Sequence, residues 1–364
     1  MKVLFLAPGN SIHSYKWITK ITELDHQVDC YWCSFEKFSE KPENHIKSYH
    51  IGIPKFCSFF SIIYAWFHFY RTAISVKPDV IHIHSLGTYS LFSCIPWILR
   101  IPFIVTPWGS DIIFGSRNMF KRFLLWFSFR NASAITCDAI HIKELVTSIS
   151  NKQHSQIINF GIDTSFFRRI NKYRPNNSSN YRIISTRNHE PIYDINTLIS
   201  ALKILKDKGI IVIANVAGSG SQTESLIKLT KSYGLESSVE FTGRYSYSTL
   251  PTLLNSHDIY VSTSLSDAGI ASSIAEAMSS ELIVIASNSG ENSYWINESR
   301  GFLFDPGSPQ SLADCIEYVI TNPNIDKCQI GCEARKMIID YNDINNEMAK
   351  ALDLLYLISS IKQT

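Results

Sequence analysis

The stretch DIYVSTSLSDAGIASSIAEAM (258–278) joins an apolar run to a helix-like segment through a turn of small residues. The run DIYVST (258–263) is typical of a buried strand, and IAEAM (274–278) is typical of a helix. The turn before the helix contains Ala268, Gly269, Ile270, Ala271 and Ser272. Small side chains leave the backbone N–H groups of such a turn accessible, and the positive end of the helix dipole adds to their attraction for a phosphate. The stretch therefore predicts a strand, an anion-binding turn and a helix.

The same alternation of strand-like runs and helix-length segments extends over the whole chain. The runs are KVLFLA (2–7), QVDCYW (27–32), DVIHI (79–83), PFIVT (102–106) and AITC (134–137), followed by RIIST (182–186), IIVIANV (210–216), SVEF (238–241), DIYVST (258–263) and LIVIA (282–286). Short continuous apolar strands that alternate with helices indicate parallel sheets covered on both faces. We expect an α/β protein with two doubly wound, Rossmann-like sheets whose strand ends face a common cleft.

Length and a polar segment favour two domains. The 364 residues exceed the usual size of one domain, and RRINKYRPNNSSNY (168–181) separates the two series of strands. We expect a first domain at 1–167, a linker at 168–180 and a second domain at 181–342. A long amphipathic helix at 343–364 ends the chain, and we assign it to the first domain.

Composition indicates an ordinary soluble protein. The net charge of +2 and the apolar share of 45% give no strong global field, so we expect no nucleic-acid partner. Scattered cysteines and a strand-like N-terminus favour a reduced, cytoplasmic protein. The pairs Cys30/Cys33 and Cys328/Cys332 lack a second pair at zinc-site spacing, and we interpret them as buried free thiols.

Two segments of the first domain are candidates for contact with a membrane. FCSFFSIIYAWFHFY (56–70) is apolar and aromatic, but it is shorter than the ~20 residues that span a bilayer. RNMFKRFLLWFSFR (117–130) places Lys121 and Arg122 among aromatic residues, which is the composition of a helix on an anionic lipid surface. The alternative is a core helix with a solvated basic edge. A peripheral position on the cytoplasmic face of the membrane therefore stays open beside a soluble one.

Glu276 lies about two turns beyond the small-residue turn. A carboxylate accepts two hydrogen bonds from a vicinal diol, so Glu276 is a candidate for binding the ribose of a nucleotide. The residues Ser273 to Glu276 also form an S-x-x-E capping box, which needs no ligand. The residues alone leave both interpretations open.

Polar side chains also follow strands of the first domain. His82 and His84 alternate along one run, so both point to one face near its carboxyl end. Asp111 follows the next run, and His13 opens the first helix, where the dipole disfavours its charged form. A histidine at a strand end is either a packed structural residue or a catalytic one. The expected cleft makes His84 and Asp111 catalytic candidates and gives His13 a place on the acceptor side.

Taken together, the motifs resemble those of retaining glycosyltransferases of family 4, which have the GT-B fold. The matching pieces are STR (185–187), NVAGSGSQTESL (215–226), SSVEFTGR (237–244), HDIYVSTS (257–264), IAEAM (274–278) and RGFLFDPGSPQSLADCI (300–316), with FLAPGNS (5–11), KPDVIHIHS (77–85), VTPWGSDI (105–112) and INFGIDTSFF (158–167) nearer the N-terminus. Each piece is weak alone, and their order and spacing carry the resemblance.

The resemblance implies roles for particular residues. Arg187 matches an arginine that holds the donor diphosphate and stabilises charge on the leaving group. The matched positions in the glycine turns, near the base and at the ribose are Gly9, Asn10, Gly218, Gly220, Arg244 and Glu276.

Three positions depart from the family pattern. Ala268 stands where members commonly have a glutamate that touches the donor sugar, and the neighbouring Asp267 is a candidate to replace it. A lysine that often follows the arginine is missing, with Tyr193 nearby. Trp108 stands where many members have a histidine near the acceptor.

The resemblance implies transfer of a sugar, with retention, from a UDP- or GDP-sugar to the hydroxyl of a saccharide or lipid-linked saccharide. No D-x-D motif occurs, so we expect neither a metal ion nor another cofactor. Surface polysaccharide, lipopolysaccharide or glycolipid biosynthesis is the expected setting. Two alternatives are a nucleotide-sugar epimerase of the same fold and a non-catalytic protein that binds nucleotide sugars.

Overall fold

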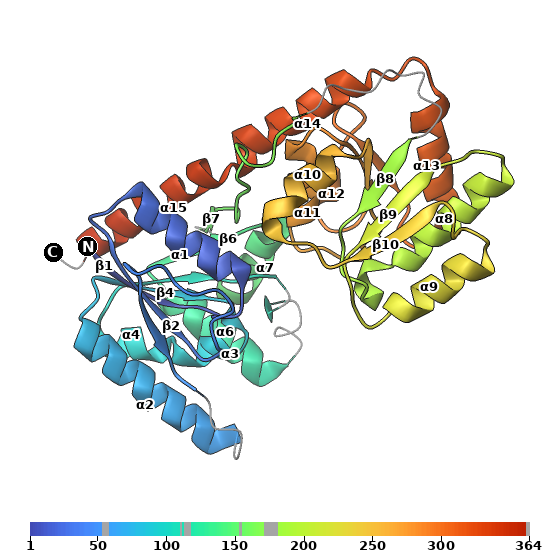
Figure 1. Cartoon of the computed structure of the whole chain (residues 1–364). Helices are drawn as coiled ribbons and strands as arrows, with labels where there is room; N and C mark the ends of the chain where they lie inside the picture. The colour runs from blue at the N-terminus through green and yellow to red at the C-terminus, as the bar shows by residue number, and fades with distance from the viewer. Residues whose placement is uncertain (53–57, 110, 113–117, 153–154, 171–180, 362–364) are drawn as a thin grey trace. The chain divides into compact units, whose positions relative to one another are not determined.

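The computed structural model contains two compact units, each built around its own parallel sheet (Figure 1). The first unit comprises Met1–Gly161 and Ile344–Thr364, and the second comprises Ile162–Asp343. The structure describes residues 1–52, 58–109, 111–112, 118–152, 155–170 and 181–361. Most of the expected linker, from residue 171 on, lies outside the described residues, as do residues 56–57 and 117 of the two candidate membrane segments.

The sheet of the first unit has seven strands in the order β3-β2-β1-β4-β5-β6-β7, and every pairing is parallel. The strands are β1 (Lys2–Leu6), β2 (Asp29–Ser34), β3 (Lys47–His50), β4 (Val80–His84), β5 (Phe103–Thr106), β6 (Ala134–Cys137) and β7 (Gln156–Ile157). The strand order reverses between β1 and β4. In sheets of this kind, ligands bind where the order reverses, at the carboxyl ends of the strands.

Helices cover both faces of this sheet (Figure 1). One face packs against α1 (Ile12–Leu24) and α15 (Ile344–Ile361). The other face packs against α2 (Ser58–Val76), α3 (Leu86–Tyr89), η1 (Ser90–Phe92), α4 (Cys94–Leu99), α6 (Met119–Asn131) and α7 (Ile140–Ser150). The C-terminal helix α15 is held by buried apolar contacts and by Glu347, whose Oε2 accepts a hydrogen bond from the Asn159 N–H at 2.7 Å.

The sheet of the second unit has six parallel strands in the order β10-β9-β8-β11-β12-β13. The strands are β8 (Arg182–Ser185), β9 (Ile213–Ala217), β10 (Val239–Gly243), β11 (Ile259–Ser262), β12 (Ile283–Ser287) and β13 (Phe302–Phe304). The order reverses between β8 and β11, so this gap is the expected ligand position in the second unit.

Two helical layers enclose the second sheet. One face packs against α8 (Ile195–Asp207), α9 (Thr223–Ser232) and α13 (Pro309–Thr321). The other packs against α10 (Leu250–Asn255), α11 (Ser272–Ser279), α12 (Asn292–Trp295) and α14 (Lys327–Asn342). Single turns η2 (Pro191–Tyr193) and η3 (Tyr247–Thr249) follow β8 and β10. Both units therefore have the expected doubly wound α/β architecture, and the common cleft stays a prediction.

The border between the units lies before the expected residue 167. The Ile162 N–H donates to the Asn342 carbonyl at 2.8 Å, and Ile162 also forms a parallel bridge with Asp343. The Phe167 side chain is fully buried in the core of the second unit. Both Ile162 and Phe167 are buried in the core of the second unit, and burial of these apolar side chains stabilises that unit. Residues 162–167 therefore belong to the second unit.

The cysteines differ in exposure from the expectation. Cys30 and Cys33 are buried as expected, and burial raises the pKa of Cys30 to about 12. Cys328 and Cys332 are exposed instead. They lie one turn apart on α14, and the side of this helix that faces the core is formed by other residues, such as Ile330 and Ala334. Among the described residues, no three His, Cys, Asp or Glu side chains form a group that could hold a metal ion. No described helix is long and apolar enough to cross a membrane.

Candidate functional site

The loops after β8 and β11 carry the charged residues at the reversal point of the second sheet. Arg187 lies two residues beyond β8, and Asp267 lies five residues beyond β11. Hydrogen bonds join the two loops, since the Leu265 N–H donates to the Ile192 carbonyl at 2.8 Å and Thr263 Oγ1 donates to the Tyr193 carbonyl at 2.7 Å. The backbone therefore holds Arg187 and Asp267 on adjacent loops.

The Arg187 guanidinium forms a buried ion pair. Its Nη2 lies 2.5 Å from Asp267 Oδ1, and both side chains are only 10% exposed. The guanidinium carbon lies 4.2 Å from the centre of the Tyr193 ring, within the range of a cation–π contact. Tyr193 lies near the position of the missing lysine. Its ring packs against the Arg187 guanidinium, whereas a lysine would have added a second positive charge.

Two serine hydroxyls complete the surroundings of the guanidinium. Arg187 Nη1 donates to Ser273 Oγ at 3.2 Å, and Nη2 donates to Ser264 Oγ at 3.3 Å. Within the described part of the chain, Arg187 Nε and Asp267 Oδ2 are buried and have no hydrogen-bond partner. Buried charged groups are normally fully hydrogen-bonded, so one donor and one acceptor of this pair are left unused in the structure.

The entrance of α11 carries no capping side chain. The cap residue is Ala271, which has extended backbone angles of −63° and 134° and cannot accept a hydrogen bond with its side chain. Ser273 is the second residue of the helix, so the capping-box interpretation of residues 273–276 is wrong. The first turn also lacks an acidic residue. The positive end of this helix dipole is therefore not neutralised by its own side chains.

The turn before α11 is partly open to solvent. Ala268, Ile270 and Ser272 are half-buried, whereas Gly269 and Ala271 are buried. The turn is held in place from behind by Gly290, where an added Cβ would lie 2.2 Å from the Asp267 carbonyl oxygen. The turn at 268–272 is thus only partly exposed, and its expected contact with a phosphate stays a prediction.

Glu276 is buried in α11, with 7% of its surface exposed. Burial raises the pKa of Tyr245 to about 12, and burial also raises the pKa values of Tyr247 and Tyr260. The negative charge of Glu276 adds to the increase at all three phenols. The carboxylate therefore lies among tyrosine side chains beside the loop of Arg187, where Tyr245 Oη donates to the Thr186 carbonyl at 3.0 Å.

The glycine turn after β9 supports the loop of Arg187. At Gly218, which has a φ of +125°, an added Cβ would lie 2.7 Å from the Arg187 carbonyl oxygen. At Gly220 an added Cβ would lie 2.4 Å from the His189 carbonyl oxygen. Both glycines are needed for the close approach of two loops. Their expected contact with a phosphate stays a prediction.

Arg244 lies apart from the ion pair. It follows β10, its Nε donates to Ser219 Oγ at 2.8 Å, and it is exposed. This position beside the glycine turn is compatible with the expected place near the base. Because its guanidinium is solvated, a charge contact there is weaker than one at the buried Arg187.

The sequence-predicted residues of the first unit form an aromatic cluster at the reversal point of its sheet. The ring centre of Trp108 lies 6.2 Å from that of His84 and 6.1 Å from that of His13. Trp17 and Phe160 fill the space between them, with ring centres 5.1 Å from His84 and 4.6 Å from His13 respectively. The fold thus brings three of the expected acceptor-side and catalytic residues together.

Burial keeps the histidines of this cluster neutral. It lowers the pKa of His84 to about 3 and that of His13 to about 4, where Lys16 adds to the effect. The rings of His82 and His84 lie 4.2 Å apart on one face, as their alternation predicts. His82 forms a hydrogen bond with Thr106 Oγ1 at 2.7 Å, whereas neither ring nitrogen of His84 has a partner among the described residues.

Asp111 binds backbone N–H groups of its own loop and of the start of α3. Its carboxylate accepts hydrogen bonds from the N–H groups of Leu86, Trp108 and Ile112, at distances from 2.5 to 3.1 Å. Burial raises the pKa of Asp111 while these hydrogen bonds oppose the increase. A carboxylate whose two oxygens are already satisfied is a positioning group, so the contacts do not support the catalytic role expected for Asp111.

Gly9 is required by the packing of its own unit. Its N–H donates to Ser34 Oγ at 2.7 Å, and an added Cβ would lie 2.9 Å from the Glu36 carbonyl oxygen. The neighbouring Asn10 is exposed. The expected role of Gly9 and Asn10 in facing the phosphates stays a prediction.

Several side chains around these sites were not foreseen. Ser264 lies two residues beyond β11, but a hydroxyl after a strand has no distinctive pattern. The tyrosines in RYSYS (244–248) do form an alternating pattern, which could have marked the surroundings of Glu276. Phe160 is distant in sequence from Trp108 and His13, so only the fold reveals their contact.

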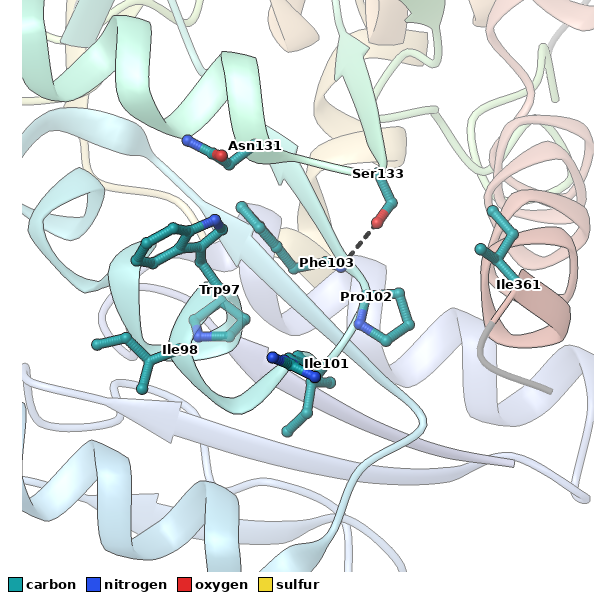
Figure 2. Close-up of a pocket in the computed structure, with 10 residues that line it drawn as sticks. Trp97, Ile98, Ile101, Pro102, Phe103, Asn131, Ser133 and Ile361 are labelled. Atoms are coloured by element: carbon teal, nitrogen blue, oxygen red, sulfur yellow. Dashed lines mark hydrogen bonds between the residues drawn. The ribbon is translucent and has the colours of Figure 1, made fainter. Parts of the chain in front are cut away.

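A pocket lies at the opposite edge of the first sheet, where the strands begin. It measures about 670 Å³ and is lined mainly by apolar side chains, among them Trp97, Ile98 and Pro102 (Figure 2). Arg100 is the charged residue of its lining. None of the sequence-predicted site residues lines this pocket, so the pocket is separate from the site that the sequence predicts.

Two family models match the chain and together span most of it. "Glycosyl transferases group 1" matches residues 167–342, and "Glycosyl transferase 4-like" matches residues 2–139. An uncharacterized glycosyltransferase of Methanocaldococcus jannaschii is 30% identical over 134 residues, which is 36% of this chain. The match spans 33% of that relative's length.

Solved structures share the fold of the whole chain. HepE of Anabaena, in complex with UDP and glucose, has a TM-score of 0.80 at 18% identity, covering 98% of this chain and 99% of that one. The lipopolysaccharide outer core galactosyltransferase WaaB, in its apo form, has a TM-score of 0.74 at 14% identity, covering 100% of both chains.

The two parallel-sheet units and these likenesses define a protein of the GT-B fold, which confirms the expected fold class. The family models narrow the assignment. The chain belongs to the glycosyl transferases of group 1.

Proposed function

We propose that the protein transfers a sugar from a UDP- or GDP-sugar to an acceptor hydroxyl, with retention and without a bound metal ion or other cofactor. The observation that carries the proposal is the buried Arg187–Asp267 pair beside the uncapped entrance of α11. A guanidinium, open backbone amides and a free helix dipole converge there, and together they suit a diphosphate.

The chemistry assigned to this site is stabilisation of the leaving group. As the bond between the sugar and the diphosphate breaks, negative charge grows on the phosphate oxygen. Arg187 and the amides of residues 268–272 are positioned to stabilise that charge before the reaction starts, so no reorganisation is needed. In the retaining route we propose, the departing phosphate takes the proton of the acceptor hydroxyl.

Asp267 competes with the diphosphate for Arg187. In the structure its Oδ1 holds the guanidinium, and the bound diphosphate takes over part of that interaction. The second oxygen, Oδ2, has no partner among the described residues and is available to a hydroxyl of the donor sugar. We therefore propose that Asp267 replaces the glutamate expected at position 268.

We assign the ribose of the donor to Glu276 and the acceptor to the aromatic cluster of the first unit. A carboxylate accepts hydrogen bonds from both ribose hydroxyls. Indole rings pack against the apolar faces of sugars, and a neutral imidazole accepts or donates one hydrogen bond to a hydroxyl. Trp108 and His13, which are partly exposed, therefore suit a neutral saccharide, whereas the ring of His84 is fully buried against Trp17 and Trp108.

We place the reaction in the assembly of a surface polysaccharide, lipopolysaccharide or glycolipid, at the cytoplasmic face of the membrane. The acceptor is a saccharide or a lipid-linked saccharide. The likeness of the fold to WaaB, which is described as a lipopolysaccharide galactosyltransferase, supports this setting, as does the family of the chain.

The test is a donor screen followed by a transfer assay. Nucleotide diphosphates raise the melting temperature if they bind the native state, which identifies the base. The matching nucleotide sugars are then incubated with bacterial glycolipid extracts in EDTA, and the anomeric configuration of the product is determined by NMR. Transfer with retention in EDTA is the expected result. Inversion, loss of activity in EDTA, or isomerisation of the donor alone would overturn the proposal.

A further inference from the structure

Helix α2 is apolar on the side that faces solvent as well as on the side that faces the core. Ala65 and Phe69 are fully buried against the sheet. On the opposite side, Phe60, Ile63 and Phe67 are 70%, 49% and 51% exposed. A helix that is apolar all round is normally covered on all sides, so the outer side of α2 is built to contact an apolar medium.

Helix α6 repeats the arrangement. It buries Leu125 and Phe129, while Phe120, Phe123 and Trp126 are 66%, 56% and 41% exposed. We call the exposed side chains of the two helices the aromatic face. It consists of Phe60, Ile63, Phe67, Phe120, Phe123 and Trp126.

Both parts of the aromatic face lie at the same edge and on the same side of the first sheet. Helices α2 and α6 pack on the same face of that sheet, opposite α1 and α15 (Figure 1). Each helix ends only a few residues before a strand, since α2 ends at Val76 before β4 and α6 ends at Asn131 before β6. Their first turns therefore lie at the other edge, where the strands end. The 19 residues of α2 extend about 27 Å in that direction.

Charge on this part of the chain is mainly positive. Residues 58–131 contain seven Lys and Arg residues but two acidic residues, although the whole chain has 34 basic and 32 acidic residues. One of the two, Asp111, is buried and bonded to backbone N–H groups. The other, Asp79, binds the Lys2 N–H at the edge where the strands begin, and two of the seven basic residues, Lys77 and Arg100, lie at that edge as well. Lys121 and Arg122 are exposed beside the aromatic face.

We propose that the aromatic face docks the protein on an anionic lipid bilayer, with α2 and α6 lying in the headgroup region. Exposed aromatic side chains enter the boundary of the acyl chains, and the basic side chains bind lipid phosphates. The inference deepens the proposed function, on which it rests for the position of the acceptor. It brings the strand-end edge that holds Trp108 and His84 close to the membrane surface, where a lipid-linked saccharide presents its hydroxyl.

The experiment measures binding of the full chain to vesicles by flotation. One set of vesicles is phosphatidylcholine, and the other contains phosphatidylcholine with 30% phosphatidylglycerol, roughly the charge density of an anionic leaflet. We expect the wild type to float with the anionic vesicles, less so as salt increases. The double variant Phe67→Ser/Phe123→Ser and the double variant Lys121→Glu/Arg122→Glu should each lower the partition coefficient about ten-fold or more.

Matched variants in the second unit serve as controls. Ile211→Ser/Ile227→Ser removes two exposed apolar side chains, and Lys228→Glu/Lys231→Glu reverses two exposed charges on α9. Both should bind vesicles as the wild type does. All variants should keep wild-type affinity for UDP or GDP, which shows that they are folded. Arg187→Ala should lose nucleotide affinity but still bind vesicles, so failure of the donor site and failure of docking are distinguishable.

Two results would overturn the proposal. One is wild-type flotation that is absent, or flotation that is unchanged in both Phe67→Ser/Phe123→Ser and Lys121→Glu/Arg122→Glu. The other is a concentration-dependent dimer that the Phe67→Ser/Phe123→Ser variant abolishes while vesicle binding stays negligible, which would make the face a contact between two copies of the chain. Tryptophan fluorescence supplies a second readout. If α6 enters the interface, the emission of Trp126 shifts to shorter wavelength on anionic vesicles, and comparison with Trp126→Phe separates this shift from the other six tryptophans.

Discussion

The two sheets reverse their strand order in the same way, but the residues at the two reversal points differ in chemistry. In the second unit the point holds opposite charges, Arg187 and Asp267, with the carboxylate of Glu276 nearby. In the first unit it holds uncharged rings, among them His84 and Trp108, and burial keeps the imidazole neutral. The same topology thus gives a charged reversal point in the second unit, called the charged position below, and an uncharged one in the first unit, called the neutral position.

This difference separates what the fold determines from what the side chains determine. Parallel strands leave free N–H groups and helix entrances at one edge of each sheet, whatever the ligand. The side chains then decide whether a polyanion or a neutral saccharide fits. The variants below test whether the charged position binds the phosphates and the neutral position does not.

The largest effect is expected for Arg187→Ala. Loss of the guanidinium removes the charge-assisted hydrogen bonds to the diphosphate, so the affinity for UDP or GDP should fall about 100-fold. It also leaves the Asp267 carboxylate buried without its partner, which should lower the free energy of unfolding by about 3 kcal/mol or more. Calorimetric titration measures the affinity, and near-UV circular dichroism establishes that the variant is folded. Arg244→Ala, which removes an exposed guanidinium, should change affinity less than about three-fold. Equal losses in both variants would contradict the ranking.

Glu276→Gln is expected to have a smaller and more selective effect. If the carboxylate binds the ribose hydroxyls, its loss weakens UDP binding about ten-fold, because hydrogen bonds to a charged group contribute about 1.5 kcal/mol. Inorganic pyrophosphate has no ribose, so its affinity should stay unchanged in this variant and fall in Arg187→Ala. If Glu276→Gln also lost pyrophosphate binding, the assignment of Glu276 to the ribose would be wrong, and its carboxylate would instead be needed for the phosphate site.

Asp267→Asn should have effects of opposite sign on binding and on transfer. Without the competing carboxylate, Arg187 is more available, and UDP binds about five-fold more tightly. Transfer is expected to slow, because the proposed contact with the donor sugar is weakened. Ser264→Ala removes a neutral partner of the same guanidinium and should change UDP affinity less than about two-fold. Weaker UDP binding in Asp267→Asn would show that the carboxylate holds Arg187 in its binding position instead of competing for it.

The sequence predicted much of the architecture, because apolar runs of strand length and the turns between them are local features. It also placed Arg187, Asp267 and Glu276 correctly at strand ends and on α11. It did not settle the cap of α11, because the cap position depends on where the loop from β11 enters the helix. That loop is held by distant residues, such as Ser287 and Ser289, whose hydroxyls bind the Ser264 carbonyl.

The role of Asp111 could not be inferred for a similar reason. An aspartate after a strand suits catalysis and loop formation equally well in the sequence. In the structure the Leu86 N–H, 25 residues away, reaches the same carboxylate, which supports loop formation. The border at residue 161 also depends on a distant partner, since Ile162 pairs with residues 342 and 343 at the other end of the unit.

The smallest effect concerns the neutral position and the pH dependence of its stability. The pKa values of His84 and His13 in the folded protein are about 3 and 4, below the ordinary value of 6.5. The unfolded chain therefore binds more protons as the pH falls below 6.5, and the free energy of unfolding decreases until the pH reaches the folded pKa values. Each buried histidine should contribute about 1 kcal/mol of loss between pH 6.5 and 5.5.

Urea unfolding followed by tryptophan fluorescence measures this slope for the first unit, which holds six of the seven tryptophans. His84→Phe keeps a ring in the cluster and removes its titration, so its slope should be shallower than that of the wild type by about 1 kcal/mol per pH unit. His26→Gln, at an exposed turn, is the matched control and should leave the slope unchanged. An unchanged slope in His84→Phe would mean that the ring is charged or solvated in the folded protein, and the contrast between a charged and a neutral strand-end edge would no longer hold.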